Sequence, residues 1–380
     1  MPSETKVCQN CKNQFTIEPE DFLFYEKIKV PSPTWCPECI WRLLLSWRNE
    51  RSLHKRKCGV SGHSEDMVSI FPANSGISNV YDYKFWWSDN WDSLPYGKEY
   101  NFSESFFEQF EKLLAEVPQP NVIQTNSINS EYCNSVLDAK NCYLVFAASR
   151  IENMHYSSWL DDMRDSLDIL WSHHGELGYE DVLCGDFYKL IFSGFSEECS
   201  ESSFLWDCRG CSYCFGCVGL RNKQYHIFNK PYSKEEYFNK IKEYNLGSFA
   251  GLTKIKRDLG EYKLKYQHKY ARIVNSVNST GDNLKNAKNA FYCFDSTMGA
   301  FEDCRYVVVP FGKDTVKDSH LSFGLGYGFS FAYQSASVIT GSSVFFSKKI
   351  WTGYNIQYSY NCHNCHDLFA CIGLRSKSYC

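Results

Sequence analysis

The sequence has no long apolar run and no large excess of charge of either sign. No window approaches the roughly 20 apolar residues of a membrane-spanning helix, and the opening residues, MPSETKVCQNCKNQF, contain no apolar segment typical of a secretion signal. The net charge of −4 excludes a polycation, so nucleic-acid binding would require local basic patches. We therefore expect a cytoplasmic protein without membrane contact.

The motifs of several large enzyme classes are also missing. The chain contains no G-x-S-x-G nucleophile motif, no Walker loop and no dinucleotide-binding fingerprint. Their absence removes the motif-based case for the corresponding hydrolases, nucleotide-hydrolysing enzymes and oxidoreductases. The sequence thus favours a protein without enzymatic activity and without a small-molecule substrate.

Cysteine, by contrast, is abundant, with 19 among 380 residues. Two couples stand near the N-terminus, Cys8-x-x-Cys11 and Cys36-Pro-Glu-Cys39. Two thiolates three positions apart on a tight turn can face one ion, and two such couples supply the tetrahedral sulfur shell of structural zinc. The residues between the couples favour strands, and the second couple opens a helical run. The spacing predicts a treble-clef zinc module over residues 1–60.

The segment from Trp41 to Lys57 is predicted to be a basic helix that follows the second couple. Arg48, Arg51 and Lys55 have the spacing of one helix face. The complete set of basic candidates is Arg42, Arg48, Arg51, Lys55, Arg56 and Lys57. Beside a zinc module, such a stripe is a candidate phosphate-binding surface, and RNA or the ribosome is the predicted partner. The alternative is a solvated helix face.

The residues that follow the zinc module are predicted to form a cap over 61–121. Tyr81, Tyr83, Phe85 and Trp87 alternate, which predicts a strand with an aromatic face. That face is either a stacking platform for bases or sugars or a hydrophobic cover on a neighbouring domain. The segment NFSESFFEQFEKLLAEVP predicts an amphipathic helix that is capped at Asn101 and buries an apolar stripe beginning at Phe102.

From residue 122 onward, short β-prone runs such as NCYLVF and SFLWD recur about every 10 to 14 residues. A β-sandwich has similar spacing. Two observations instead favour a parallel β-helix, or solenoid: similar Cys-containing motifs recur at matching points, and CSYCFGCVGLRNKQYH is duplicated as CHDLFACIGLRSKSYC. The prediction is a mainly β chain with a first array over 122–232, a helical insert over 233–272 and a second array over 273–380.

The ends of the two arrays differ in sequence. The first array continues past His226 into a strand and a helix capped at Ser233, whereas the second reaches Cys380 at the equivalent of His226. By analogy, we expect a further strand and helix beyond Cys380.

Three other clusters are candidates for chemistry. Cys208, Cys211, Cys214 and Cys217 have iron–sulfur-like spacing, although a cysteine ladder inside the coils is the favoured alternative. The aspartates from Asp161 to Asp168, together with the tryptophan-rich segment, would suit a carbohydrate-active or carbohydrate-binding β-helix. The alternative is that these aspartates are polar turn residues, and the same alternative applies to His173-His174. The stretch from Leu252 to Arg272 is a second basic patch interleaved with tyrosines. It is either a binding surface or a solvated face whose tyrosines pack on the arrays.

Several segments carry a resemblance to known proteins. Cys8, Cys11, Phe15, Phe22, Cys36, Pro37, Cys39 and Arg42 resemble the pattern of short bacterial proteins described as a probable zinc-ribbon domain. The motifs SWRNERSLHKRKC, YDYKFWWSDNWD, FFEQFEKLLAEVP, DCRGCSYCFGCVGLRNKQY and NKPYSKEEYF extend the resemblance over nearly the whole chain, to a zinc-ribbon and β-solenoid family known mainly from environmental genomes of very small bacteria. The resemblance implies the zinc module and brings no activity. This chain departs from the family in having fewer cysteines in its first array.

Overall fold

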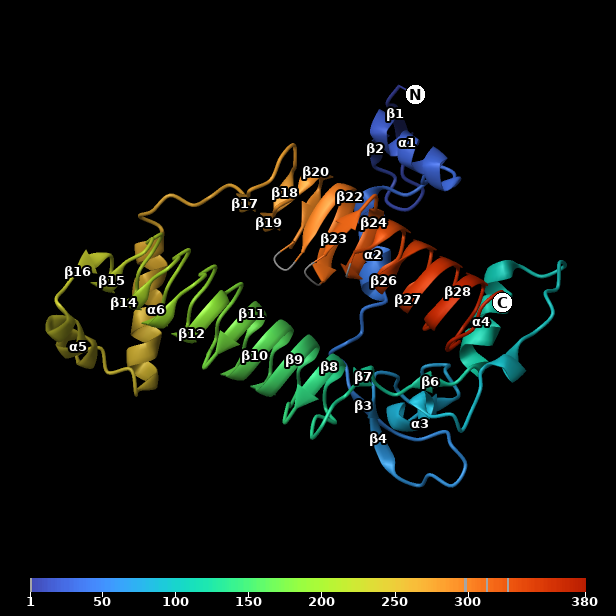
Figure 1. The fold of residues 1–380 in the computed structure, drawn as a ribbon, viewed down its shortest axis with the longest axis horizontal. Coiled ribbons are helices and arrows are strands. Elements are labelled where there is room, and N and C mark those ends of the chain that lie inside the picture. The colour runs from blue at the N-terminus through green and yellow to red at the C-terminus, as the bar shows by residue number, and fades with distance from the viewer. Residues whose placement is uncertain (1, 297–298, 312–313, 327) are drawn as a thin grey trace.

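The structure is a computed structural model that describes residues 2–296, 299–311, 314–326 and 328–380. Two β-solenoid arrays make up most of it, with helical and irregular segments around them (Figure 1). The chain passes along the first array in one direction and returns along the second in the other. The predicted class, a mainly β chain with a parallel solenoid, is confirmed.

The N-terminal module contains a two-stranded hairpin and two helices. These elements are β1 (Glu4–Val7), β2 (Gln14–Ile17), α1 (Pro19–Ile28) and α2 (Pro37–Ser46). Helix α1 occupies part of the segment predicted to form strands; Pro19 at its first position and acidic residues in its first turn favour the helix. Helix α2 ends at Ser46 and a strand begins at His54, so the predicted basic helix is wrong beyond residue 46.

The cap is built from short elements. They are β3 (His54–Lys57), β4 (Asp66–Ser69), β5 (Val80–Tyr81), α3 (Tyr83–Trp87), the 3-10 turn η1 (Leu94–Tyr96), α4 (Phe106–Glu116) and β6 (Gln119–Pro120).

Two predictions for the cap are wrong. The aromatic strand is interrupted at Asp82, whose side chain accepts a hydrogen bond from Lys84 N (3.0 Å) and thereby caps α3. Helix α4 is capped by Ser105 rather than Asn101, and the supposed stripe residue Phe102 lies outside it, 92% exposed.

The first array consists of β7 (Gln124–Thr125), β8 (Asn134–Lys140), β9 (Phe146–His155), β10 (Ser158–Leu167), β11 (Leu170–Glu176), β12 (Gly185–Ile191), β13 (Ser200–Ser203), β14 (Ser212–Phe215), β15 (Gln224–Ile227) and β16 (Lys230–Pro231). The insert contains α5 (Lys234–Lys242) and α6 (Phe249–Lys263). The second array consists of β17 (Ile273–Val274), β18 (Gly281–Asp282), β19 (Leu284–Lys285), β20 (Lys288–Phe291), β21 (Cys293–Phe294), β22 (Ala300–Phe311), β23 (Thr315–Lys317), β24 (His320–Gly326), β25 (Ser330–Tyr333), β26 (Ala336–Phe345), β27 (Lys348–Gln357) and β28 (His363–Phe369).

One coil of the first array is twelve residues long. Its strands pair in parallel with the strands of the next coil, and paired residues such as Asn134 and Phe146 lie twelve positions apart. The second array is less regular: partners lie fifteen apart at Arg305↔His320 and twelve apart at Ala336↔Lys348. Stacking successive coils therefore places residues twelve apart directly above one another in the first array.

Each coil turns a corner at every third residue. From Ser135 to Phe228, the backbone has positive φ at nearly every third position, including at bulky residues such as Trp159 (φ 61°). This left-handed conformation costs roughly 1–2 kcal/mol for a residue with a Cβ. Hydrogen bonds between coils offset the cost, since corner N–H groups donate to the preceding coil, as from Tyr156 N to Tyr143 O (3.0 Å).

The residues that point inward also recur at every third position and are mostly aliphatic or small. Many are serine or cysteine, and these serve the backbone as well as the packing. Ser157 Oγ donates to His155 O (2.7 Å) and accepts from Ile169 N (3.0 Å) on the next coil. Cys208 Sγ donates to Trp206 O (3.6 Å) in the same manner as Ser157. Interior serine and cysteine thus satisfy backbone groups that the strand ladders leave unpaired.

Ladders of identical polar side chains tie the corners together on the outside. Asn129 Nδ2 donates to Asn141 Oδ1 (3.0 Å), and Asn141 Nδ2 donates to Asn153 Oδ1 (3.1 Å). The ladder ends where Asn153 Nδ2 donates to Asp165 Oδ1 (2.7 Å). Asparagine suits these positions twice over, because it tolerates the left-handed conformation and carries both a donor and an acceptor.

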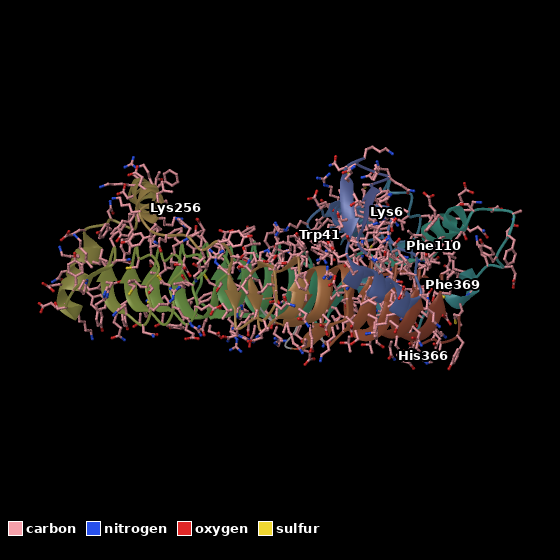
Figure 2. All side chains as sticks on the ribbon, turned by 90° about the horizontal axis from the view of Figure 1, so that it is seen from above. Lys6, Trp41, Phe110, Lys256, His366 and Phe369 are labelled. Carbon is pink, nitrogen blue, oxygen red and sulfur yellow. The ribbon has the colours of Figure 1, made fainter. Side chains whose placement is uncertain are left out.

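The helical insert packs on the first array. The predicted capping box of α5 is present, with Ser233 and Glu236 bonded to each other's backbone. In α6, Tyr262 Oη donates to Phe228 O (2.6 Å) and Lys263 Nζ lies 3.8 Å from the Trp206 ring centroid. Tyr262 and Lys263 of the basic insert therefore pack on the first array, whereas Tyr270 is fully exposed. Figure 2 shows α6, marked by Lys256, projecting from the same side as the N-terminal module, marked by Lys6.

We expect Ser157→Ala to lower the free energy of unfolding by about 1–3 kcal/mol, because it leaves a buried donor and a buried acceptor without partners. Urea denaturation followed by circular dichroism measures this change. The control is Ser61→Ala at an exposed position, for which a change within about 0.5 kcal/mol is expected. Equal effects of the two substitutions would contradict the interior role of serine.

Candidate metal centre and basic residues

The structure brings Cys8, Cys11, Cys36 and Cys39 into one cluster. All four sulfur atoms lie within 4.8 Å of one another. Cys8 and Cys11 sit in the turn between β1 and β2, a knuckle closed by the hydrogen bond from Lys12 N to Cys8 O (3.0 Å). Cys36 is the N-cap of α2, and Cys39 lies in its first turn. The predicted arrangement, with one couple on a loop and the other at a helix start, is therefore present.

The donor set and its spacing fit a tetrahedral metal ion. Cys11 Sγ and Cys36 Sγ are 3.8 Å apart, and the edge of a tetrahedron with zinc–sulfur bonds of about 2.3 Å is also about 3.8 Å. The sulfurs accept outer hydrogen bonds, from Cys36 N to Cys8 Sγ (3.2 Å) and from Asn10 Nδ2 to Cys39 Sγ (3.3 Å). Such N–H donors stabilise thiolate charge and orient metal ligands.

The pKa values of two thiols indicate how well the metal-free cluster stabilises thiolate charge. Burial alone would raise the pKa of Cys8, but backbone N–H groups, led by that of Cys36, lower it to about 6. Burial raises the pKa of Cys36 to about 12, and the neighbouring cysteines contribute in the same direction. A cluster that stabilises one thiolate but penalises further negative charge is suited to a cation, which lowers the cost of every thiolate.

The cysteine module docks on the second array through α1 and α2. Phe24 stacks on His320 with ring centroids 3.7 Å apart, and Trp41 Nε1 donates to Tyr306 O (2.9 Å). Asp21, which is 2% exposed, faces the Arg305 guanidinium at 3.6 Å. Burial raises the pKa of Asp21, while the charge of Arg305 opposes that rise. The sequence contained no signal for this interface, because its partners lie almost 300 residues apart.

Arg48, predicted to contact phosphate, is instead buried between the two arrays. Its guanidinium lies 4.8 Å from the Trp159 ring and 5.1 Å from the Phe323 ring, and its side chain is 10% exposed. It pairs with Glu50 and donates from Nη1 to Ser337 Oγ (2.7 Å). The helix ends before this residue, so Arg48 turns inward rather than lining a helix face with Arg51 and Lys55.

The other basic candidates are divided between structural and exposed positions. Arg56 spreads its guanidinium over backbone carbonyls of Phe71, Pro72, Ile77 and Ser78, at 3.4–3.5 Å. Lys57 pairs with Asp66 at 2.9 Å. Arg42 on α2, Arg51 in the turn and Lys55 on β3 are exposed. The continuous stripe predicted from helical spacing is therefore not formed.

The run of Cys208, Cys211, Cys214 and Cys217 fills the interior of one twelve-residue coil. All four are at most 1% exposed and belong to the first array's core. Their sulfurs donate to backbone carbonyls, as Cys214 Sγ does to Ser212 O (3.4 Å). Leu368 is likewise interior in the second array, in the coil whose cysteines are Cys362, Cys365 and Cys371. The favoured alternative, a cysteine ladder, accounts for these positions.

The residues considered for carbohydrate chemistry do not converge. Asp162, Asp165 and Asp168 occupy successive corners of one coil, so their side chains diverge, and Asp161 is held by Ser149 and Arg150. A glycosidase needs two carboxylates that flank one bond.

The tryptophan-rich segment is a cover on the second array. Trp86 is fully buried and donates from Nε1 to Pro118 O (2.9 Å). Trp87 stacks on Trp351 at 6.1 Å, and Arg375 donates from Nη2 to Trp91 O (2.9 Å). Of the two alternatives considered for the aromatic residues of the cap, the hydrophobic cover is the one that the structure contains.

A second group with metal-binding geometry involves a residue that the sequence analysis did not name. Ligand atoms of His173, His174 and Asp186 lie within 4.8 Å of one another. Asp186 lies twelve residues after His174, and His174 Nδ1 is 3.2 Å from Asp186 Oδ1. The twelve-residue coil length is the signal that would have paired them. The contact between His174 and Asp186 is also a corner ladder of the kind that asparagines form, and such a ladder brings these side chains together without a bound ion.

Comparisons with known proteins add little to this description. No protein-family model matches the sequence, and no curated protein matches it. Among solved structures, the chain is similar to one described as an acetyltransferase from Desulfovibrio desulfuricans G20, at 10% identity and a TM-score of 0.14, over 64% of this chain and 62% of that one. The chain thus spans less than two thirds of that protein. Within the described residues, no helix has the length and apolar character needed to cross a membrane.

We expect Arg48 and Arg51 to behave oppositely despite their predicted common face. Arg48→Met should destabilise the protein by roughly 3–5 kcal/mol, because it leaves Glu50 as an unpaired, largely buried carboxylate. Arg51→Met, at an exposed position, should change stability by less than about 0.5 kcal/mol. Thermal and urea unfolding of both variants checks this, and equal small effects would contradict the buried position of Arg48.

Proposed function

We propose that this protein is a non-enzymatic scaffold in which a zinc-bound N-terminal module holds the two solenoid arrays in one mutual orientation. The observation that carries the proposal is the position of residues 1–50. The cysteine cluster orders the module, the module packs on the second array, and the following residues lie between the arrays. Asn134 Nδ2 of the first array donates to Glu50 O (3.2 Å), close to the Arg48 contact with Phe323 of the second.

Zinc is the proposed ion because four thiolates in a closed tetrahedral shell are typical of structural zinc sites. Nothing in the cluster resembles a catalytic site, in which a coordination position is left to water or substrate. The ion would replace the apolar core that a module of this size is too small to build for itself.

We expect purified protein to contain about one zinc ion per chain, and Cys39→Ser to lose it. Elemental analysis measures the content. Acid should release the metal, since falling pH protonates the thiolates and thus removes the ligands. The matched control is Cys380→Ser, an exposed cysteine outside the cluster, which should retain the metal. A zinc content unaffected by replacing all four clustered cysteines would refute the assignment.

The same two variants test the scaffold. Loss of zinc should release the module from the second array and allow the two arrays to move apart. The radius of gyration measured by small-angle X-ray scattering should therefore rise, while the circular dichroism signal of the arrays persists. Cys380→Ser should match the natural chain. If the zinc-free variant has the same radius of gyration as the natural protein, the module does not hold the two arrays together.

RNA is the partner that we propose for the scaffold, through the basic residues that the fold leaves exposed. Arg42, Arg51 and Lys55 form no ion pair with any residue in the described part of the chain, and they flank the segment that joins the module to the cap. Exposed, unpaired cations are the groups that can displace counterions from phosphate. Arg48 and Arg56 are not part of this surface, because their guanidinium groups are committed to internal contacts.

We expect the triple variant Arg42→Glu, Arg51→Glu, Lys55→Glu to abolish binding of a fluorescent RNA hairpin at about 50 mM salt and to flatten its salt dependence. The charge-matched control replaces Lys230, Lys234 and Lys242 with Glu; these residues are exposed at the far end of the first array. Fluorescence anisotropy measures both. Absence of RNA binding by the natural chain, or equal losses in both variants, would count against this partner surface.

A further inference from the structure

A cavity of about 860 Å³ lies where the two arrays, the cap and the segment after α2 meet. Its walls come from β8 and β9 of the first array, from β26 and β27 of the second, and from residues 70–87 of the cap. Its size falls within the range of about 300–1,000 Å³ that is usual for small-molecule sites, which also favour domain junctions. Most of the lining is apolar, and the aromatic part consists of Trp47, Phe71, Tyr83, Trp87, Trp351 and Tyr360.

Two lysines at successive positions line this apolar space. Lys349 is only 9% exposed. Its ammonium lies 5.4 Å from the Tyr360 ring centroid and 5.8 Å from that of Phe71, and it has no hydrogen bond or ion pair with any residue that the structure describes. Little of this side chain reaches solvent, and contact with aromatic faces compensates only part of the cost of leaving an ammonium without a counter-ion. An anion in the cavity would supply that counter-ion.

Lys348 and Arg48 lie beside Lys349 in the cavity wall. Lys348 donates to Trp47 O, and its ammonium lies 5.0 Å from the Trp47 ring centroid. Burial, with the charges of Lys349 and Arg48, lowers the pKa of Lys348 to about 6, and Glu50 offsets this only in part. Glu50 is the one acidic residue in the lining and is already paired with Arg48. Of these three groups, Arg48 is neutralised by Glu50, Lys348 is largely uncharged near neutral pH, and Lys349 is the cation without a counter-ion among the described residues.

Two hydroxyl groups in the wall also await partners. Ser75 Oγ and Thr125 Oγ1 are buried and form no hydrogen bond with the described residues. Both belong to the cavity lining. Buried polar groups are usually satisfied, so these two hydroxyl groups are exceptions at the edge of the cavity.

We propose that this cavity binds an amphipathic anion, a molecule with an apolar or aromatic body and one anionic head group that pairs with Lys348 and Lys349. The apolar walls receive the body, and the Lys349 ammonium receives the head group, whose negative charge also favours protonation of the neighbouring Lys348. This goes beyond the scaffold function and departs from the expectation that the protein takes no small molecule. Because the cavity lies between the two arrays and beside the cap, a bound molecule would contact all three at once.

Two dyes that differ chiefly in charge test the proposal on the full-length, zinc-containing protein. The anionic probe is 8-anilinonaphthalene-1-sulfonate, and the neutral one is N-phenyl-1-naphthylamine, which has the same rings without the sulfonate. We expect the anion to bind one site per chain and at least tenfold more tightly than the neutral dye. Lys349→Met should weaken binding of the anion roughly tenfold and leave binding of the neutral dye within about twofold. The control Lys189→Met, at an exposed corner where Lys189 pairs with Glu201, should change neither.

A measurement on the natural chain alone guards against misfolding of a variant. Laurate should displace the bound anionic dye, whereas 1-dodecanol, with the same chain and no charge, should require at least tenfold higher concentration. Equal displacement by the acid and the alcohol, absence of saturable binding of the anionic dye, or unchanged affinity in a folded Lys349→Met variant would each overturn the proposal.

Discussion

The narrow twelve-residue coil is the constraint on which the rest of the structure depends. A coil this short must turn at every third residue, so one third of its backbone adopts the left-handed conformation and one third of its side chains point into a small interior. Both requirements cost free energy for residues other than glycine. Both are met by stacking, since each coil supplies hydrogen-bond partners to the next. An isolated coil would have none of these partners, so stability accumulates only along the array.

This constraint explains the composition. Interior positions are enclosed on all sides, and their neighbouring backbone groups must find partners inside the coil. Serine and cysteine are small enough to be enclosed and can also donate to these backbone groups. Most of the cysteines are therefore core residues whose thiols donate to carbonyl groups, as at Cys142, Cys208 and Cys365. The four N-terminal cysteines differ because their sulfurs face one another and accept N–H donors, an arrangement that suits an ion.

Two long arrays with smooth sides have no intrinsic reason to adopt one mutual orientation. In this protein, small elements lie at their junction: the cysteine module, the segment around Arg48 and the aromatic cap. The arrays also touch there directly, since the Trp159 and Phe323 rings are 6.1 Å apart. Gly324 illustrates how closely these parts fit, because a Cβ at this position would lie 2.9 Å from the Arg48 Nη1 atom. Where these elements meet the arrays, they also enclose the cavity that contains Lys348 and Lys349. The cysteine cluster and the cavity are therefore separate features of one junction.

The sequence by itself determined the cysteine cluster of Cys8, Cys11, Cys36 and Cys39, the solenoid class, the duplication and the capped helix at Ser233, because each depends on local spacing or on repetition along the chain. The period of three within each coil was not recognised, although C-x-x-C-x-x-C-x-x-C displays that period directly.

Only the tertiary structure decided which charges are available. Arg48 and Arg51 are equivalent by spacing, yet one is enclosed by Trp159 and Phe323 and the other is exposed. Lys349 is one lysine among many until Phe71 and Tyr360 cover it. Burial depends on contacts between residues hundreds of positions apart, and no local pattern records such contacts.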